Sequence, residues 1–432
     1  MNGGTCFLQA GIRWAMTACL ILAVWAGPGA RVCRAESFWD QFSPLQFQGF
    51  VETRVGCHTQ DNAHEEEASV LETRVQGELS TSTDWARFKY KGDVWYDGVQ
   101  EEVIYDTREA WMITRPLDEL DLKVGRQILT WGTGDLVFIN DLFPKDWQSF
   151  YIGRDAEYLK APSDSVKVSG FFELLNLDMV YTPRFAADRF ITGEYVSYWD
   201  GNTRALAGNE LQLEYDQPDN WFEDDELAVR AYRTVGAYEV ALYGYWGLWK
   251  CPGGQDESGK GLFPGLDVYG GSVRGPLGPG IGNLEIGYYH SWEDPDGNDP
   301  LINNSEMRYL AGYTQEIAKN LTGSMQYYVE QILDYDHYRK DTEDEYARDN
   351  WRHVATLQLT WLLMNQDLDL SLEGYYSPSD LDAYLRPKIT YKYTDHLTQE
   401  IGANIFWGER EHTTFGQHQD DTNVFMALRY SF

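Results

Sequence analysis

The last eleven residues of the chain, 422–432, read TNVFMALRYSF. Every second position from Val424 to Phe432 is apolar or aromatic, whereas the alternate positions, which begin at Asn423, include Arg429 and Ser431. A period of two is that of a β-strand, whose successive side chains point to opposite faces. The stretch therefore predicts a terminal strand with one apolar face and one mostly polar face.

The same alternation recurs along the chain in segments separated by turns. In 69–79, for example, Glu72 and Arg74 alternate with Leu71 and Val75. Short turns alternate with long acidic connections, and the number of segments is about 18, within a range of roughly 16 to 20. This pattern predicts an all-β fold, a transmembrane antiparallel β-barrel with short periplasmic turns and long extracellular loops. A soluble all-β protein is the alternative.

Two regions interrupt the regular alternation. The phase of the strand expected at 104–114 is open, because the adjacent Arg108 and Glu109 cannot both face the lumen of a regular strand. The region 184–226 is expected to be a long outer loop with local β-structure, since a further spanning strand there would upset the even strand number. The terminal strand is expected to pair with the first strand and so remove the edges of the sheet.

The N-terminus has the features of a secretory signal. Arg13 supplies a positive charge, 15–26 is an apolar core too short to span a bilayer, and 33–35 resembles a small-x-small cleavage site. We therefore expect a signal peptide at 1–35 and an outer-membrane barrel at 36–432. An uncleaved N-terminal anchor is the alternative.

The charge balance restricts the partners. The chain has 35 basic and 68 acidic residues, a formal net charge of −33, which repels nucleic acid. The expected partners are outer-membrane lipid, lipopolysaccharide and small solutes. The aromatic terminus at Phe432 resembles the C-terminal signature of bacterial outer-membrane barrels, which implies recognition by the barrel-assembly machinery. Cys57 and Cys251, both in predicted loops, could pair in an oxidising compartment. The oligomeric state stays open.

Basic side chains recur at predicted lumen positions, and charged rings in a pore select solutes by sign. One hypothesis is a channel wall that favours anionic solutes. The alternative is that these cations are neutralised by carboxylates on neighbouring strands. The candidate pore-lining residues on strands are Arg54, Arg87, Lys89, Lys91, Arg308, Arg352, Arg386, Lys388, Lys392 and Arg429.

The connection 132–164 is too long for an ordinary loop, so we expect it to be functional or folded into the lumen. Arg126 and Arg154 are candidate anchors of a constriction, through pairing with the carboxylates of Asp141 and Asp146. The alternative is a loop that packs on the rim for stability.

Short motifs at this connection resemble a known group of proteins. The chain has GRQ at 125–127, WG at 131–132, ND at 140–141 and FPKD at 143–146. This pattern resembles the strand-end motif of bacterial porin-like barrels related to the alginate-export family and to a GRQ/WG-type family, with Phe143 where the latter usually has Asn. The resemblance implies an outer-membrane pore, which in the alginate case passes an anionic polysaccharide.

The sequence offers no recognisable catalytic site, metal site or cofactor site. No serine–histidine signature is evident, and the histidines have no strong metal-ligand spacing. The stretch 254–260 matches G-x-x-x-x-G-K, but Gly261 follows where a nucleotide loop needs Ser or Thr. We therefore expect a passive channel for small or anionic solutes, with carbohydrates among the candidates. The alternatives are a structural or adhesive barrel with a blocked lumen and an outer-membrane barrel hydrolase.

Overall fold

The computed structural model describes residues 42–341 and 346–432. The predicted signal peptide, 1–35, lies outside the described residues. The unit 45–432 is compact by itself. Within the described part of the chain, no helix has the length and apolar character needed to cross a membrane.

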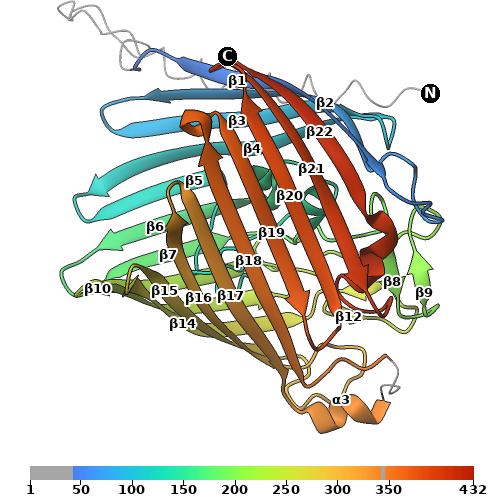
Figure 1. The fold of residues 1–432 in the computed structure, drawn as a ribbon. Helices are drawn as coiled ribbons and strands as arrows, with labels where there is room; N and C mark the ends of the chain where they lie inside the picture. Colours follow the sequence, from blue (N-terminus) through green and yellow to red (C-terminus); the bar gives the residue numbers. More distant parts are fainter. Residues whose placement is uncertain (1–41, 342–345) are drawn as a thin grey trace, which may run out of the picture. The chain divides into compact units, whose positions relative to one another are not determined.

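Eighteen strands form one closed antiparallel sheet (Figure 1). Each strand pairs with the next, and β22 pairs with β1, which closes the barrel. The predicted strand number and the predicted closure are both confirmed. In chain order, the strands are β1 (Gln46–His58), β2 (Val70–Ser82), β3 (Ala86–Asp97), β4 (Glu102–Leu117), β5 (Leu120–Ile128), β6 (Pro162–Phe171), β7 (Asn176–Thr182), β10 (Glu226–Val235), β11 (Tyr238–Leu248), β14 (Gly265–Leu277), β15 (Gly280–Ser291), β16 (Glu306–Ala318), β17 (Leu321–Ile332), β18 (Trp351–Leu363), β19 (Leu368–Ser377), β20 (Asp382–Lys392), β21 (Leu397–Gly408) and β22 (Asn423–Ser431).

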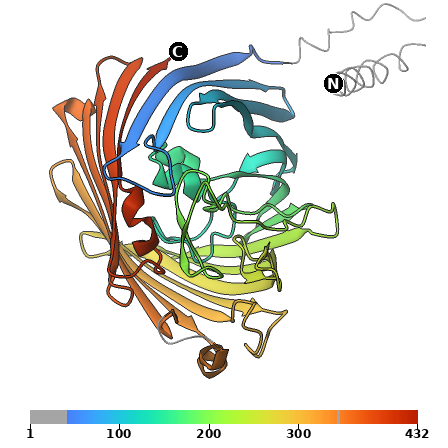
Figure 2. The same cartoon turned by 90° about the vertical axis from the view of Figure 1, so that its right-hand side faces the viewer.

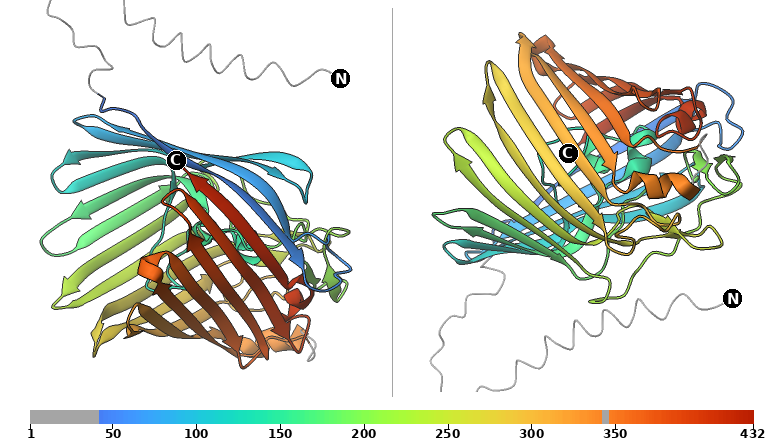
Figure 3. Two further views of the ribbon diagram at one scale, coloured as in Figure 1. Left: turned by 45° about the horizontal axis from the view of Figure 1, so that its top comes forward. Right: turned by 90° about the horizontal axis from the view of Figure 1, so that it is seen from below.

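The two ends of the barrel differ in their connections. Tight turns gather at one end, and long loops gather at the other (Figure 1, Figure 3). The predicted outer loop at 184–226 is present and contains the short hairpin of β8 (Tyr198–Asp200) and β9 (Ala205–Ala207). Other long loops contain β12 (Gly254–Gln255), β13 (Gly261–Leu262) and α3 (Tyr335–Asp341). The asymmetry matches short periplasmic turns and long extracellular loops.

The faces of the wall follow the predicted period of two. On β22, Leu428 is 50% exposed and points outward, whereas Ala427 is 2% exposed and points inward. Val424, Met426 and Tyr430 share the outer face with Leu428. The outer surface is therefore apolar and suited to lipid, and the inner surface carries most of the buried charge.

Two local predictions differ from the structure. The predicted conflict between Arg108 and Glu109 is resolved by a β-bulge, where Lys91 pairs with Glu109 and Gly92 pairs with Thr107. The extra residue in the bulge lets both side chains face the lumen. Cys57 lies in β1, so the prediction of a loop was wrong, and both Cys57 and Cys251 are free thiols.

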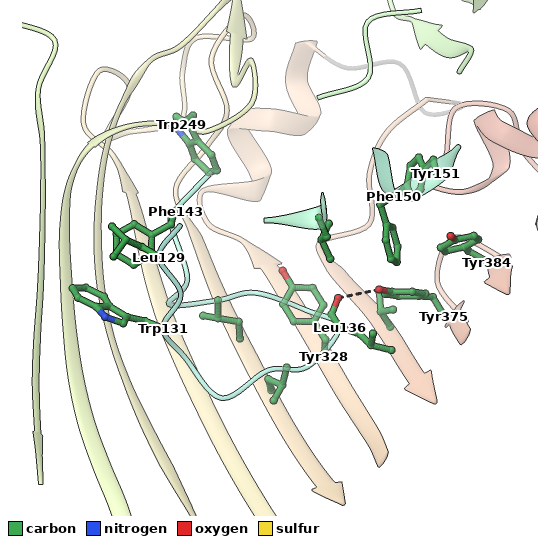
Figure 4. Packing of buried hydrophobic residues seen from close by; sticks show 14 of the residues in the cluster. Leu129, Trp131, Leu136, Phe143, Phe150, Tyr151, Trp249, Tyr328, Tyr375 and Tyr384 are labelled. Atoms are coloured by element: carbon green, nitrogen blue, oxygen red, sulfur yellow. Dashed lines mark hydrogen bonds between the residues drawn. The ribbon is translucent and has the colours of Figure 1, made fainter. Parts of the chain in front are cut away.

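The connection between β5 and β6, residues 129–161, folds into the barrel and is called here the inward segment. Figure 2 looks into the barrel and shows its short helix inside the ring of strands. This helix is α2 (Trp147–Tyr151), and a 3₁₀ turn follows at Ala156–Leu159. The main apolar cluster of the molecule joins the inward segment to tyrosines of the wall (Figure 4). The core of this protein therefore lies inside the lumen.

Candidate constriction of the lumen

The inward segment begins where the 125–132 motifs end β5. Gly125 has a φ of +120°, and a Cβ there would lie 2.2 Å from the Ala110 carbonyl oxygen of β4. Only glycine fits that backbone without strain. Trp131 then packs edge-on against Phe143, with ring centroids 4.9 Å apart. The motif residues thus direct the chain from the wall into the lumen.

One carboxylate of the wall clamps the first half of the inward segment. Glu285 on β15 accepts hydrogen bonds from the backbone N–H of Thr133 at 2.8 Å and of Asn140 at 2.8 Å. The Thr133 hydroxyl and the Asn140 side-chain amide also donate to Glu285, each at 2.9 Å. This buried side chain therefore fixes two points of the segment, residues 133 and 140, with one carboxylate.

Neutral groups of the neighbouring strands hold the chain between these two points. The side-chain oxygen of Gln326 on β17 accepts from the Leu136 N–H at 3.3 Å. The Tyr375 hydroxyl on β19 donates to the Leu136 carbonyl at 3.2 Å (Figure 4). On β14, a Cβ at Gly270 would lie 1.8 Å from the Asn140 side-chain oxygen, so this wall position needs glycine.

The predicted anchors of Asp141 and Asp146 are not the observed ones. Asp141 pairs with Lys145 at 3.1 Å, inside the segment itself. Asp146 caps α2 by accepting from the Ser149 N–H at 2.7 Å, and it pairs with Arg189 of the next outer loop at 3.2 Å. Both carboxylates are buried and each has a nearby cationic partner, Lys145 for Asp141 and Arg189 for Asp146, which leaves the predicted arginines to other partners.

Arg154 anchors the second half of the segment to a different part of the wall. Its guanidinium pairs with Glu72 of β2 at 3.0 Å and with Asp97 of β3 at 3.4 Å. Burial opposes this positive charge, but Glu72 and other carboxylates outweigh burial and raise the pKa of the guanidinium above its ordinary value. The Arg154 carbonyl accepts from Arg386 of β20 at 2.6 Å, and the Gly153 carbonyl accepts from Arg54 of β1 at 2.5 Å.

Several anchors of the segment were not among the predicted site residues, among them Arg108, Glu72 and Glu285. Arg108 donates to the carbonyls of Glu157 at 2.9 Å and Lys160 at 3.0 Å. The broken alternation at Arg108 was a signal that this residue has a special role. Glu72 and Glu285 followed the regular alternation, and nothing local distinguished them from other lumen carboxylates.

Most predicted pore-lining cations lie in the lumen and are paired. The pairs are Arg54 with Glu400 (2.8 Å), Lys89 with Glu109 (3.0 Å), Lys91 with Glu157 (3.2 Å), Arg308 with Glu306 (2.7 Å), Arg352 with Asp380 (2.6 Å), Arg386 with Glu373 (3.5 Å), Lys388 with Glu400 (3.3 Å) and Arg429 with Glu52 (2.8 Å). Within the described ranges, Arg87 and Lys392 have no carboxylate within 4.0 Å. This pairing favours neutralisation of the cations by neighbouring carboxylates over an uncompensated basic wall.

Arg126 is the predicted lumen residue that lies elsewhere. The register pairs it with Ala110 and Asp164, on the outward face that Val124 and Val166 share. Its guanidinium donates to the Thr107 carbonyl at 2.6 Å and pairs with Asp164 at 3.2 Å. Arg126 therefore joins β4 to β6 across the end of β5.

No protein family profile and no curated relative matches the sequence. The fold, in contrast, matches solved structures. OccK5 of Pseudomonas aeruginosa has a TM-score of 0.53 at 8% identity, over 90% of this chain and 96% of that chain. OccAB3 of Acinetobacter baumannii has a TM-score of 0.52 at 10% identity, over 90% and 99%.

This is the fold of an outer-membrane porin. The closed barrel of eighteen antiparallel strands, the apolar outer face and the structural matches agree on that point. At such low identity the matches concern the fold alone. The relationship of this porin-like barrel to the alginate-export family remains a prediction.

Proposed function

We propose that this protein is a passive outer-membrane channel for small solutes, and that the inward segment is its constriction. The observation that carries the proposal is the attachment of the segment to opposite parts of the wall, through Glu285 on one side and Arg154 on the other. A segment that is fixed at two opposite sides reduces the open width of the lumen, and the barrel wall keeps its shape.

A preference for anionic solutes is the finer part of the proposal. Lys123 of β5 and Lys167 of β6 lie directly opposite each other on the lumen face. Lys167 has one acidic neighbour, Asp178, at 3.6 Å, and the Lys123 ammonium lies over the Trp111 ring at 4.2 Å. Like charges in opposed positions destabilise a sheet, and a passing anion would relieve that repulsion. Anionic carbohydrates are one class that fits this description.

Planar-bilayer recording of the purified full-length protein tests the proposal. We expect discrete conductance steps and a reversal potential, in a KCl gradient, that shifts toward the chloride potential. The double variant Lys123→Gln/Lys167→Gln should reduce that shift, whereas Lys319→Gln, in a turn between β16 and β17, should not. Clear cation selectivity would contradict the anion preference.

A barrel with a blocked lumen is the second candidate, because the inward segment has its own buried apolar cluster. A complete lack of conductance steps would favour that structural or adhesive role. We propose no catalytic role, and lipase and protease assays on the folded protein test this. We further propose cleavage after residue 35 and assembly through β22, which mass spectrometry of the mature N-terminus and truncation of Phe432 would check.

A further inference from the structure

We propose that the barrel wall has a lateral portal between β4 and β6, through which amphiphilic solutes with an anionic head group pass between the lumen and the outer leaflet. The inference rests on the proposed membrane location, but it does not require the passage of hydrophilic solutes. Three observations support the portal: a gap in strand pairing, a cavity beside that gap, and an aromatic cavity next to the first one.

The gap lies along the upper half of β4. On its β3 side, β4 is paired from Glu102 to Thr114. On its β5 side, pairing begins only at Ala110, opposite Arg126. Among the described residues, 102–109 therefore has no strand partner on that side. The chain that would continue β5 upward is the inward segment, which has left the wall.

The outward face of this unpaired edge is apolar. Val103 and Tyr105 are 70% and 60% exposed on its outer face, next to the exposed Val94 and Tyr96 of β3. In hydrocarbon, backbone N–H and C=O groups need partners, so a spanning wall does not leave a strand edge open without polar groups beside it. The Arg126 side chain supplies one such group by donating to the Thr107 carbonyl at 2.6 Å.

A cavity of about 460 Å³ lies beside the gap, because Arg126 and Arg189 line it and contact Thr107 and Asp106 of the unpaired edge. Its lining includes Arg126 and Asp164, which the register places on the outer face, and Gln148, which belongs to α2 inside the barrel. Residues from both sides of the wall thus line one space. Arg184 and Arg189 of the outer loop also line it, together with the acidic Asp188 and Glu194. Arg189 is paired with Asp106 and Asp146, so Arg184 is the cation that this cavity offers to an anionic head group.

The second cavity, of about 360 Å³, lies in the lumen and is mainly aromatic. Its lining includes Phe138, Trp147, Phe150, Tyr384 and Phe415. A polar lumen for hydrophilic solutes does not need such a surface, whereas the apolar part of an amphiphile does. Phe190 lines both cavities, so the aromatic space and the polar space adjoin.

The test uses the anionic amphiphile 1-anilinonaphthalene-8-sulfonate, whose fluorescence rises when it reaches phospholipid. Cells that express the full-length protein are compared with cells that lack it. Ala187→Trp fills the portal cavity, because Ala187 lines it. Ala205→Trp is the matched control, because Ala205 is exposed in the β8–β9 hairpin and does not line the cavity. Heat-modifiable mobility in gels confirms that each variant is a folded barrel.

We expect Ala187→Trp to reduce probe entry to the rate of cells without the protein, while Ala205→Trp keeps the wild-type rate. Liposome swelling in glucose should be the same for both variants. Equal probe entry in the two variants would overturn the portal. A parallel loss of probe entry and swelling would also overturn it, since both solutes would then share the central lumen.

A second variant is expected to raise probe entry, and a folding defect would not explain such an increase. Arg126→Ala removes the side chain that joins β4 to β6, and we expect probe entry to rise above the wild-type rate. Arg274→Ala, on the distant β14, should not change it. If wild-type liposomes do not swell at all, the channel proposal fails while the probe measurements still decide the portal.

Discussion

The two halves of the inward segment are held in different ways. The first half meets β15, β17 and β19 through one carboxylate, one amide and tyrosine hydroxyls, among them Glu285 and Tyr375. The second half meets β1, β2, β4 and β20 through guanidinium groups, among them Arg154 and Arg108. The comparison teaches that one half is fixed by hydrogen bonds between uncharged groups of the segment and acceptors or donors of the wall, including the Glu285 carboxylate, and the other half by guanidinium groups, among them the buried ion pairs of Arg154.

Breaking the charged half should have the largest effect on stability. Arg154→Met removes the pairs of Arg154 with Glu72 and Asp97 and leaves Arg74, at 3.2 Å, as the remaining cationic partner of the buried Glu72 carboxylate. Breaking a buried pair costs about 3–5 kcal/mol, so we expect a loss at the lower end of that range. Urea unfolding of the barrel in detergent would measure this change. In the double variant Glu72→Gln/Arg154→Met, we expect a loss smaller than the sum of the single losses. Strictly additive losses would show that the two side chains are not energetically coupled.

Breaking the half that is held by hydrogen bonds to Glu285 should have a smaller effect on stability. Glu285→Gln keeps the shape of the side chain but replaces one acceptor oxygen by an NH₂ group, which leaves buried donors unsatisfied at about 1–3 kcal/mol. Hydrogen exchange at the amides of Thr133 and Asn140 should become faster, while the amides near Arg154 stay protected. Equal acceleration in both halves would mean that the segment moves as one unit.

A pH scan sharpens the comparison, because the loops beside the charged half contain a titrating group. Burial, with the nearby charges of Asp421 and Glu210, raises the pKa of Glu65 to about 9. A raised pKa favours the folded loops most below the ordinary value of 4.5, and this contribution declines as the pH rises toward about 9. Proteolysis of the loop 59–69 should therefore become faster with rising pH, and Glu65→Gln should remove that dependence. An unchanged pH profile in the variant would contradict the assignment.

The smallest effect on stability is expected for the more exposed ion pairs of the second half of the inward segment. Lys91 and Glu157 pair at 3.2 Å, but the Glu157 side chain is 36% exposed. Such a pair contributes about 0–1 kcal/mol, so Lys91→Gln should hardly change the urea midpoint. If Lys91→Gln lowered the free energy of unfolding as much as Arg154→Met, solvent exposure would not explain the difference between the two ion pairs.

The strands of the wall could be predicted from the sequence because the alternation within each strand shows which residues share a face. The pattern of 422–432 gave the correct phase, with Leu428 outward and Arg429 inward. A bulge is not visible in such a pattern, and the adjacent Arg108 and Glu109 showed only that the alternation failed there.

The site could be predicted only in part. The length of the connection after β5 indicated an inward fold, and that expectation agrees with the observed segment. The partners of Arg154 could not be predicted, because Glu72 and Asp97 are brought to it by barrel closure and not by spacing in sequence. Arg126 was predicted in the lumen as a partner of Asp141 and Asp146, although alternation with Val124 places it on the outward face.

The most direct test of the constriction is the single-channel conductance of a variant that lacks 134–158. The control is a deletion of 201–204 at the tip of the β8–β9 hairpin, with folding of both variants verified by heat-modifiable mobility. The proposal predicts a larger conductance than wild type for the first deletion and the wild-type value for the second. An unchanged conductance after removal of 134–158 would contradict it.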